Sequence, residues 1–240
     1  MKIYAVIPAY DERPSISLTI NALLHEGGVA MQPIVVDDGS RDGTSQILDE
    51  LAADGTILLI RHTRNRGVGA AFLSGFQLAL QKATDQDIVM VLEADGTSDP
   101  SLLPEMIEMI ETDRADVVIA SRFIPGGCMC NFPFLRVILS RACNLLLRKA
   151  AKVPGVRDYT NFYRAYRPAT LRRALAGLTR HPEDFSFNAY LLVKAASFAR
   201  IRELPFRYDY SRKKSSSKLK LGSNFLSYLT LLRLLIFGGR

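Results

Sequence analysis

The segment KIYAVIPAYDE, residues 2–12, decides the fold, because a continuous apolar run ends there in polar residues. Residues 2–8 have the length of a strand, and an uninterrupted apolar run is typical of strands buried on both faces, as in parallel sheets. Residues 13–24 follow with apolar side chains at helical spacing. The segment therefore predicts a strand, a polar turn and a helix.

The same alternation continues to residue 121. Short β-α repeats of this kind predict an α/β fold with a mostly parallel central sheet and helices on both faces. Further strands are expected at residues 33–38, 56–61, 87–92 and 116–121, and helices at 43–53, 67–82 and 100–111, with Thr44 as a candidate helix cap.

The second half of the chain is less regular, and neither a linker nor an internal repeat divides it. Residues 225–237 are apolar but interrupted by Ser227, Thr230 and Arg233, so we expect a helix that packs on the protein or lies on a membrane. The other expected elements are a long helix with an apolar body and several bases at 134–152, strands at 161–166 and 201–206, a helix at 186–197 and a polar, basic segment at 211–220.

Composition excludes several classes of protein. The 240 residues are 48% hydrophobic and 23% charged, which excludes a disordered chain, a collagen-like repeat and a disulfide scaffold. A net charge of +7 favours anionic partners. The three cysteines fit reduced thiols better than a zinc site, and we expect no secretory signal.

Polar clusters follow four of the predicted strands, at the edge where parallel sheets bind ligands. Glu93 and Asp95 could share Mg²⁺ or Mn²⁺, although solvated acids of a capping loop are the alternative. Asp38 could accept hydrogen bonds from a base or a ribose, or belong only to a turn.

Basic residues offer candidate anion sites. Arg122 ends a strand, and Arg136 and Ser140 share a helix face, so the three could hold a phosphate; the alternative for Arg136 is a solvated face. Nucleic acid is the weaker interpretation, because the basic run lacks aromatic residues and the strand ends are acidic. The run Arg212, Lys213, Lys214, Lys218 and Lys220 fits a flexible lid, a membrane-facing patch or a solvated loop.

These motifs in this order resemble the family 2 glycosyltransferases with the GT-A fold. The first-half motifs are IPAYDE at 7–12, VDDGS at 36–40, the EAD at 93–95 and SRF at 121–123. The motifs NFPFLR at 131–136, RD at 157–158, ELPF at 203–206 and SKL at 217–219 resemble the dolichyl-phosphate and polyprenyl-phosphate mannose synthases within that family. The resemblance implies one GT-A domain over residues 1–240, with a nucleotide-sugar half (1–123) and an acceptor-binding, membrane-facing helical half (124–240).

The resemblance also implies roles for matching residues. The acceptor-phosphate set would be Arg122, Arg136 and Ser140, and Asp158 would be a weak base or a sugar-orienting group, with a structural turn carboxylate as the alternative. Arg212, Lys214 and Lys218 would belong to a loop that closes over donor and acceptor. The donor set would be Pro8, Tyr10, Glu12 and Asp38 on the nucleoside, together with Ala94. Asp95 and Glu93, on either side of Ala94, would hold a divalent metal.

Three positions depart from the family pattern. Glu93 replaces an Asp, Thr97 replaces a frequent Gln, and Asn188 stands where many relatives carry an acid.

The leading hypothesis from the resemblance is an inverting enzyme that moves mannose from GDP-mannose to a polyprenyl phosphate, peripherally at the cytoplasmic face of a membrane. A small membrane-protein partner stays open. The alternatives are a UDP- or other nucleotide-sugar donor with a different lipid or small-molecule acceptor, and a nucleotide-sugar-binding protein with impaired catalysis.

Overall fold

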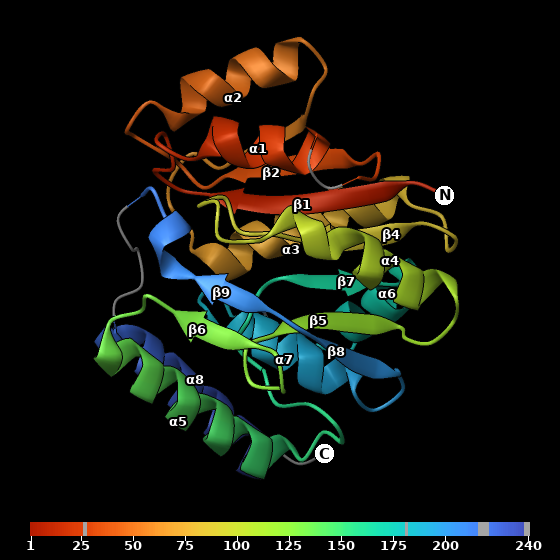
Figure 1. Ribbon diagram of the computed structural model, residues 1–240, viewed down its shortest axis with the longest axis vertical. Coiled ribbons are helices and arrows are strands. Elements are labelled where there is room, and N and C mark those ends of the chain that lie inside the picture. Colours follow the sequence, from red (N-terminus) through yellow and green to blue (C-terminus); the bar gives the residue numbers. More distant parts are fainter. Residues whose placement is uncertain (26–27, 181, 216–220, 238–240) are drawn as a thin grey trace.

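The computed structural model describes residues 1–25, 28–180, 182–215 and 221–237. The α/β fold predicted from the sequence is confirmed: helices cover both faces of a mostly parallel sheet (Figure 1). Its strand order is β3-β2-β1-β4-β7-β5-β8, and only β7 runs antiparallel to its neighbours. The strands are β1 (Ile3–Ala9), β2 (Gln32–Asp37), β3 (Leu58–Arg61), β4 (Ile88–Val91), β5 (Val117–Ser121), β7 (Arg164–Tyr166) and β8 (Ile201–Pro205).

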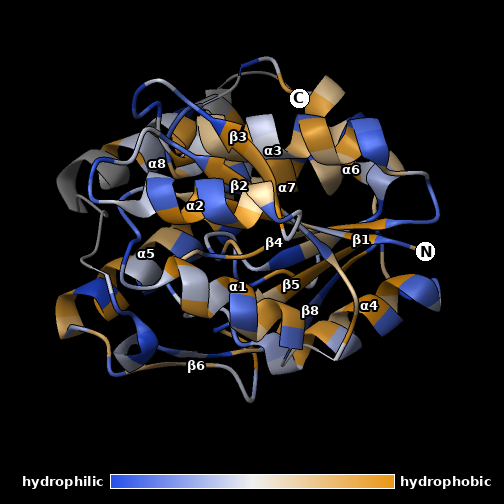
Figure 2. Ribbon diagram, turned by 90° about the horizontal axis from the view of Figure 1, so that it is seen from above, coloured by the Kyte–Doolittle hydropathy of each residue, from blue (hydrophilic) through white to orange (hydrophobic). Residues whose placement is uncertain are grey.

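Helices pack on the two faces because alternate residues of each strand point in opposite directions. Tyr4 and Val6 belong to the core cluster on the face of α3 and α7, whereas Ile3, Ala5 and Ile7 belong to the cluster under α1, α2 and α4. Figure 2 shows hydrophobic colouring on the inner strands and mixed colouring on α2 outside them. The helices are α1 (Ile16–His25), α2 (Thr44–Ala53), α3 (Val68–Lys82), α4 (Leu103–Glu111), α5 (Phe134–Ala151), α6 (Pro168–Ala176), α7 (Ser186–Ala195) and α8 (Leu221–Phe237).

Small residues let α3 lie close to the sheet. A Cβ atom added at Gly75 would collide with Val6 of β1. Gly39, in the turn after β2, has a φ of +75°, and a Cβ atom there would collide with the backbone of Arg64. Glycine is therefore required at both positions, one for packing and one for the turn that leads out of the strand end.

Several elements differ from the sequence-based expectation. α6 was not predicted, and neither were β6 (Cys128–Cys130) and β9 (Arg207–Asp209), which pair as a separate two-stranded parallel sheet. Strands of three residues are too short to show a period of two. Thr44 does not cap α2, because Gly43 occupies the N-cap; the Thr44 hydroxyl instead accepts the Glu12 N–H at 2.8 Å.

The C-terminal helix α8 packs on the protein. Leu231 and Leu232 are buried in the cluster shared with α3 and α7, and the Tyr228 hydroxyl donates to the Phe185 carbonyl at 3.2 Å. Among the described residues, no helix combines the length and apolarity needed to cross a bilayer. A membrane-facing position for this part of the chain stays a prediction.

Candidate active site

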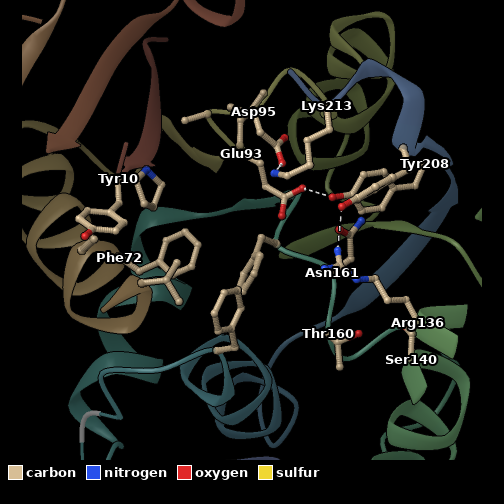
Figure 3. A pocket seen from close by; sticks show the side chains of 18 of the residues that line it. Tyr10, Phe72, Glu93, Asp95, Arg136, Ser140, Thr160, Asn161, Tyr208 and Lys213 are labelled. Atoms are coloured by element: carbon tan, nitrogen blue, oxygen red, sulfur yellow. Dashed lines mark hydrogen bonds and ion pairs between the residues drawn. The ribbon is translucent and has the colours of Figure 1, made fainter. Parts of the chain in front are cut away.

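A cavity of about 510 Å³ opens at the carboxyl ends of the parallel strands (Figure 3). Parallel strands that run in one direction end at one edge, so segments distant in the sequence converge there. Helix α5 and strand β9 contribute the opposite wall. The lining residues that were assigned from the sequence to the donor, the metal or the acceptor phosphate are Pro8, Tyr10, Glu12, Asp38, Glu93, Ala94, Asp95, Arg122, Arg136 and Ser140.

The acid pair Glu93 and Asp95 follows β4 and is held in place by hydroxyl groups. The Thr97 hydroxyl donates to Glu93 Oε2 at 2.9 Å and also contacts Asp95, whose Oδ1 accepts the Thr97 N–H at 3.1 Å. The Tyr208 hydroxyl donates to Glu93 Oε2 at 2.9 Å. Thr97, at a departure from the family pattern, thus links the two carboxylates, and Tyr208 was not identified from the sequence because β9 was not predicted.

Negative charge is concentrated around this pair. Burial and, to a smaller extent, the charge of Asp95 raise the pKa of Glu93 to about 7. Burial also raises the pKa of Glu12, a neighbour in the same cavity wall. A cluster of buried carboxyl groups remains ionised only if a cation lies close by.

Lys213 supplies that cation. Its Nζ atom forms an ion pair with Asp95 Oδ2, and the two side chains are only 11% and 8% exposed. Burial opposes the charged lysine, but the charge and hydrogen bond of Asp95, together with the charges of Glu93 and Glu12, outweigh it and raise the pKa of Lys213. The ammonium therefore lies beside Asp95 where a bound metal cation would have to lie (Figure 3).

Asp38 directly follows β2, and its carboxylate accepts hydrogen bonds from three donors. Its Oδ1 accepts from His62 Nδ1 at 2.6 Å and from the Arg66 N–H at 2.9 Å, and its Oδ2 accepts the Gly67 N–H at 2.8 Å. His62 Nε2 lies 2.9 Å from the Ser74 hydroxyl. Ser74, His62 and Asp38 therefore form a hydrogen-bonded chain, but only Asp38 lines the cavity.

This chain of contacts orients Asp38. His62 was not identified as a site residue from the sequence. Its position directly after β3, at the edge where ligands bind, could have indicated it.

Arg122 and Asp158 form a buried ion pair. Arg122 Nε and Nη2 donate to the two carboxylate oxygens of Asp158 at 2.8 and 2.7 Å, and Nη2 also donates to Thr160 at 2.8 Å. Burial alone would raise the pKa of Asp158, but the charge and hydrogen bonds of Arg122 lower it. Asp158 is fully buried and does not line the cavity. Asp158 therefore positions Arg122, which favours the structural alternative, and its role as a weak base or sugar-orienting group stays a prediction.

Arg136 and Ser140 lie one turn apart on α5 and both face the cavity, as their spacing predicts. Arg136 Nη1 donates to the Tyr210 hydroxyl at 2.9 Å, and its guanidinium carbon lies 5.4 Å from the Tyr210 ring centroid. No carboxylate pairs with Arg136 among the described residues. Its charge is therefore available to an anion in the cavity.

Aromatic rings also line the cavity. The Phe162 ring centroid lies 5.0 Å from that of Phe72 and 5.6 Å from that of Phe185. Leu139 of α5 and Tyr228 of α8 line the same cavity. An acidic region, a cationic region and an apolar region thus share one cavity.

In the basic loop, a different residue faces the cavity from those assigned to it from the sequence. Arg212 pairs with Asp99 at 3.1 Å, and neither Arg212 nor the exposed Lys214 lines the cavity. Lys213, between them, faces inward instead, because the short 3-10 turn Tyr210–Arg212 directs adjacent side chains to different sides. Lys218 lies outside the described residues. The closing role of the loop stays a prediction.

The buried pair predicts a large effect on stability. Asp158→Asn keeps the shape but leaves Arg122 without a counter-charge, and breaking a buried pair costs roughly 3 kcal/mol or more. We expect chemical denaturation to show a loss of unfolding free energy on this scale. Asp49→Asn, which breaks an exposed pair with Arg61, is the control and should cost about 1 kcal/mol or less. Equal losses in the two variants would contradict the structural role.

The raised pKa of Glu93 predicts a pH-dependent stability. Between its ordinary value of 4.5 and about 7, the folded protein holds a proton that the unfolded chain releases. The contribution of this proton is complete below pH 4.5 and disappears as the pH rises through 7. Relative to Glu93→Gln, the wild-type protein should lose unfolding free energy on the order of 3 kcal/mol between pH 4.5 and 8. If the unfolding free energies of the two proteins change in parallel between pH 4.5 and 8, the pKa of Glu93 is not raised.

Comparison with known proteins identifies the family. Residues 4–175 match the profile of glycosyl transferase family 2. The chain is 34% identical over 224 residues to an undecaprenyl-phosphate mannosyltransferase of Micrococcus luteus, covering 92% of this chain and 89% of that protein. It is 36% identical over 170 residues to a polyprenol monophosphomannose synthase of Mycolicibacterium smegmatis, covering 70% of this chain. It is 30% identical over 234 residues to a dolichol-phosphate mannosyltransferase of Pyrococcus furiosus, covering 95% of this chain.

The chain spans 62% of the length of the last two relatives. Among solved structures, glucosyl-3-phosphoglycerate synthase from Mycobacterium tuberculosis, in complex with Mn²⁺ and UDP-glucose, is similar with a TM-score of 0.68 at 18% identity, covering 98% of this chain and 79% of that one. TarS of S. aureus in complex with UDP-GlcNAc is similar with a TM-score of 0.63 at 19% identity, covering 98% of this chain and 66% of that one. These structures confirm the fold, and the profile and the relatives together show that the chain belongs to glycosyl transferase family 2.

Proposed function

We propose that the chain is an inverting glycosyltransferase that transfers mannose from GDP-mannose to a polyprenyl phosphate. One observation carries the proposal: a single cavity combines an acid pair with its cation, a cationic group without a carboxylate partner, and a wall of aromatic rings. The relatives, named for mannosyl transfer to polyprenol, undecaprenyl phosphate and dolichol phosphate, support mannose as the sugar and a polyprenyl phosphate as the acceptor.

The acceptor fits the cationic and aromatic regions. Arg136 has a planar fork that suits a phosphate group, and Ser140 lies one turn further along α5. The neighbouring rings of Phe72, Phe162 and Phe185 suit the first part of an isoprenoid chain, because they offer apolar contact in the same cavity as Arg136 and Ser140. A water-soluble acceptor would leave these rings without a partner.

The donor fits the strand ends, where Pro8, Tyr10 and Glu12 line the cavity together with Asp38. The residues present also suit a divalent metal, Mn²⁺ or Mg²⁺. No three His, Cys, Asp or Glu side chains gather to hold a metal anywhere in the described part of the chain. Asp95 and Glu93 would therefore supply one or two oxygen ligands and leave the others to diphosphate and water, as these ions prefer. Bound there, the metal would neutralise charge on the leaving diphosphate.

The reaction is a single displacement. An oxygen of the acceptor phosphate attacks the anomeric carbon, that bond forms as the bond to the nucleoside diphosphate breaks, and the configuration inverts. A phosphate monoester has a second pKa near 6, so it is already mostly dianionic at neutral pH and needs no general base. Arg136, with Arg122 behind it, offsets the repulsion between the two anions. The burial of Asp158 is consistent with this chemistry.

Asn188 bears on the alternative of impaired catalysis. Its side-chain amide donates to the backbone carbonyl of Asn161 at 2.7 Å, and the backbone carbonyl of Asn188 accepts from Arg164 Nη1 at 2.8 Å. Asn188 is buried and does not line the cavity, so this departure from the family pattern supports the wall without removing a group from it. A different nucleotide sugar or a different acceptor remains the second candidate function.

The deciding experiment offers the protein radiolabelled GDP-mannose, UDP-glucose or UDP-GlcNAc, with polyprenyl phosphate and Mn²⁺. We expect lipid-soluble label from GDP-mannose. Lipid-soluble label from a UDP-sugar only would overturn the donor, and water-soluble product would overturn the acceptor. Donor binding without transfer to any acceptor would establish the impaired-catalysis alternative.

Variants in the same assay test the site. Asp95→Ala should lower transfer at least about 100-fold, as losses of electrostatic stabilisation commonly do. Arg136→Ala should raise the acceptor KM or lower kcat, while the dissociation constant of GDP-mannose changes less than about 3-fold, since Arg136 lies away from the strand ends. Loss of donor affinity with an unchanged acceptor response would contradict the assignment of Arg136.

Lys213 generates a prediction about the metal. If its ammonium occupies the cation position on Asp95, Lys213→Gln should bind Mn²⁺ more tightly than the wild-type protein in the absence of nucleotide, by about 10-fold. The readout is free Mn²⁺ in a spectroscopic titration. Lys214→Gln, which removes an exposed charge next to it, is the control. Equal affinities for all three proteins would refute competition between Lys213 and the metal.

The acceptor is a lipid, so we also propose that the enzyme works peripherally at the cytoplasmic face of a membrane. Helix α5 supports this proposal, since Phe134, Leu135, Ile138, Leu145 and Leu146 expose apolar side chains between basic ones. A small membrane-protein partner stays a prediction.

A further inference from the structure

A second cavity, of about 370 Å³, opens beside α5 and has a basic wall. Arg141 and Arg148 come from α5, Arg157 from the segment after it, and Arg122 from the end of β5. We call this group of four residues the arginine pocket. A further hollow of about 310 Å³ shares Arg148 and Arg157 with it and adds Lys152, so the positive charge extends beyond the pocket.

Three of the four charges of the arginine pocket, those of Arg141, Arg148 and Arg157, are not neutralised within the described part of the protein. Helix α5 contains no Asp or Glu. Among the described residues, none of the guanidinium groups of Arg141, Arg148 and Arg157 forms an ion pair. The two acids behind the pocket are already engaged: Asp158 binds Arg122, and Glu203 accepts the N–H groups of Arg157 and Asp158 at 3.0 and 2.7 Å. Three guanidinium groups without an ion-pair partner therefore face one cavity, next to Arg122, which is paired with Asp158, and no carboxylate lies in the wall of this cavity.

The pocket is distinct from the acceptor region and is partly built into the protein. Arg136 and Ser140 line the first cavity and not the second, whereas Arg122, only 8% exposed, lies in the wall of both. Its Nε and Nη2 atoms are fixed by Asp158 and Thr160, which holds the guanidinium in one orientation. Such a fixed group suits a ligand that also binds the exposed Arg141, Arg148 and Arg157.

The pocket borders on the exposed apolar strip of α5. Leu145, which is 52% exposed, lines the pocket itself, and Leu146 and Phe134 are 41% and 79% exposed on the same helix. Arg141 and Arg148 are seven residues apart, so they lie on one face of α5 with Leu145 between them. Apolar side chains flanked by arginines are typical of helices that lie in the headgroup region of a bilayer.

We propose that the arginine pocket binds the phosphate headgroup of an anionic phospholipid in the bilayer on which α5 lies. The arginine forks suit phosphate oxygens, and the adjoining leucine contacts the start of the acyl chains. The inference rests on the proposed function in placing the protein at a membrane. The lipid is a ligand that holds the enzyme on the surface, and it is separate from the acceptor.

The test compares the full chain with Arg141→Gln/Arg148→Gln. Lys2→Gln/Lys82→Gln is the matched control: it removes the same charge from exposed residues near β1 and α3, which Figure 1 places away from α5. We expect the arginine variant to lose about 10-fold or more in affinity for phosphatidylcholine vesicles that contain phosphatidylglycerol, and the control to change little. Equal losses in the two variants would reduce the effect to net charge and overturn the pocket.

A second measurement separates the ligand classes. Monomeric dihexanoyl phosphatidylglycerol, titrated by calorimetry or NMR, should bind saturably to the wild type and the control but not to the arginine variant. Inorganic phosphate that binds as tightly as this lipid, or a single-stranded RNA that binds more tightly and with the same dependence on the arginines, would overturn the lipid assignment.

Mannosyl transfer to a short, water-soluble isoprenyl phosphate provides the independent check. Arg141 and Arg148 do not line the first cavity, so the arginine variant should retain this activity within about 2-fold. Loss of this activity along with lipid binding would show that the arginines serve the acceptor site and would overturn the proposal. If the wild-type protein binds the lipid but transfers no sugar, the proposed function fails and the lipid site stands.

Discussion

The buried ion pair between Arg122 and Asp158 joins the two halves of the site. Arg122 ends the last parallel strand of the first half, and Asp158 begins the segment that leads into β7. The Asp158 carboxylate also accepts the N–H groups of Thr160 and Asn161 at 3.2 and 3.1 Å, so the pair fixes the backbone that forms the cavity wall. Because a charge inside a protein is stable only with its partner, the position of Arg122 and the course of this segment depend on each other.

A second constraint is the balance of charge at the strand ends. Glu12, Glu93 and Asp95 crowd one end of the cavity, and the ammonium of Lys213 compensates them. Binding of a metal and a diphosphate would bring both a cation and new anions into this region.

The two cavities beside α5 are lined by different arginines of this helix. One side of the helix presents Arg136 and Ser140 to the catalytic cavity, and the other presents Arg141 and Arg148 to the arginine pocket. Arg122 contributes to both walls. In the proposed function, a single helix would both hold the protein on a bilayer and bind the phosphate of the acceptor, since both tasks require arginine next to apolar surface.

Sequence alone determined the order of strands and helices in the first half and the edge at which ligands bind, because parallel strands make local apolar runs and their polar ends must converge. The motifs around Tyr10, Asp38 and Asp95 also sufficed to place the chain in its family. Tertiary structure alone decided which side chains complete the site: Lys213 reaches Asp95 across 118 residues, and Tyr208 reaches Glu93 across 115. Nothing local in the sequence encodes such contacts, since they depend on how β9 and the following turn pack over the sheet. For the same reason Asp158, which reads as a candidate base in the sequence, is a buried partner of Arg122 in the fold.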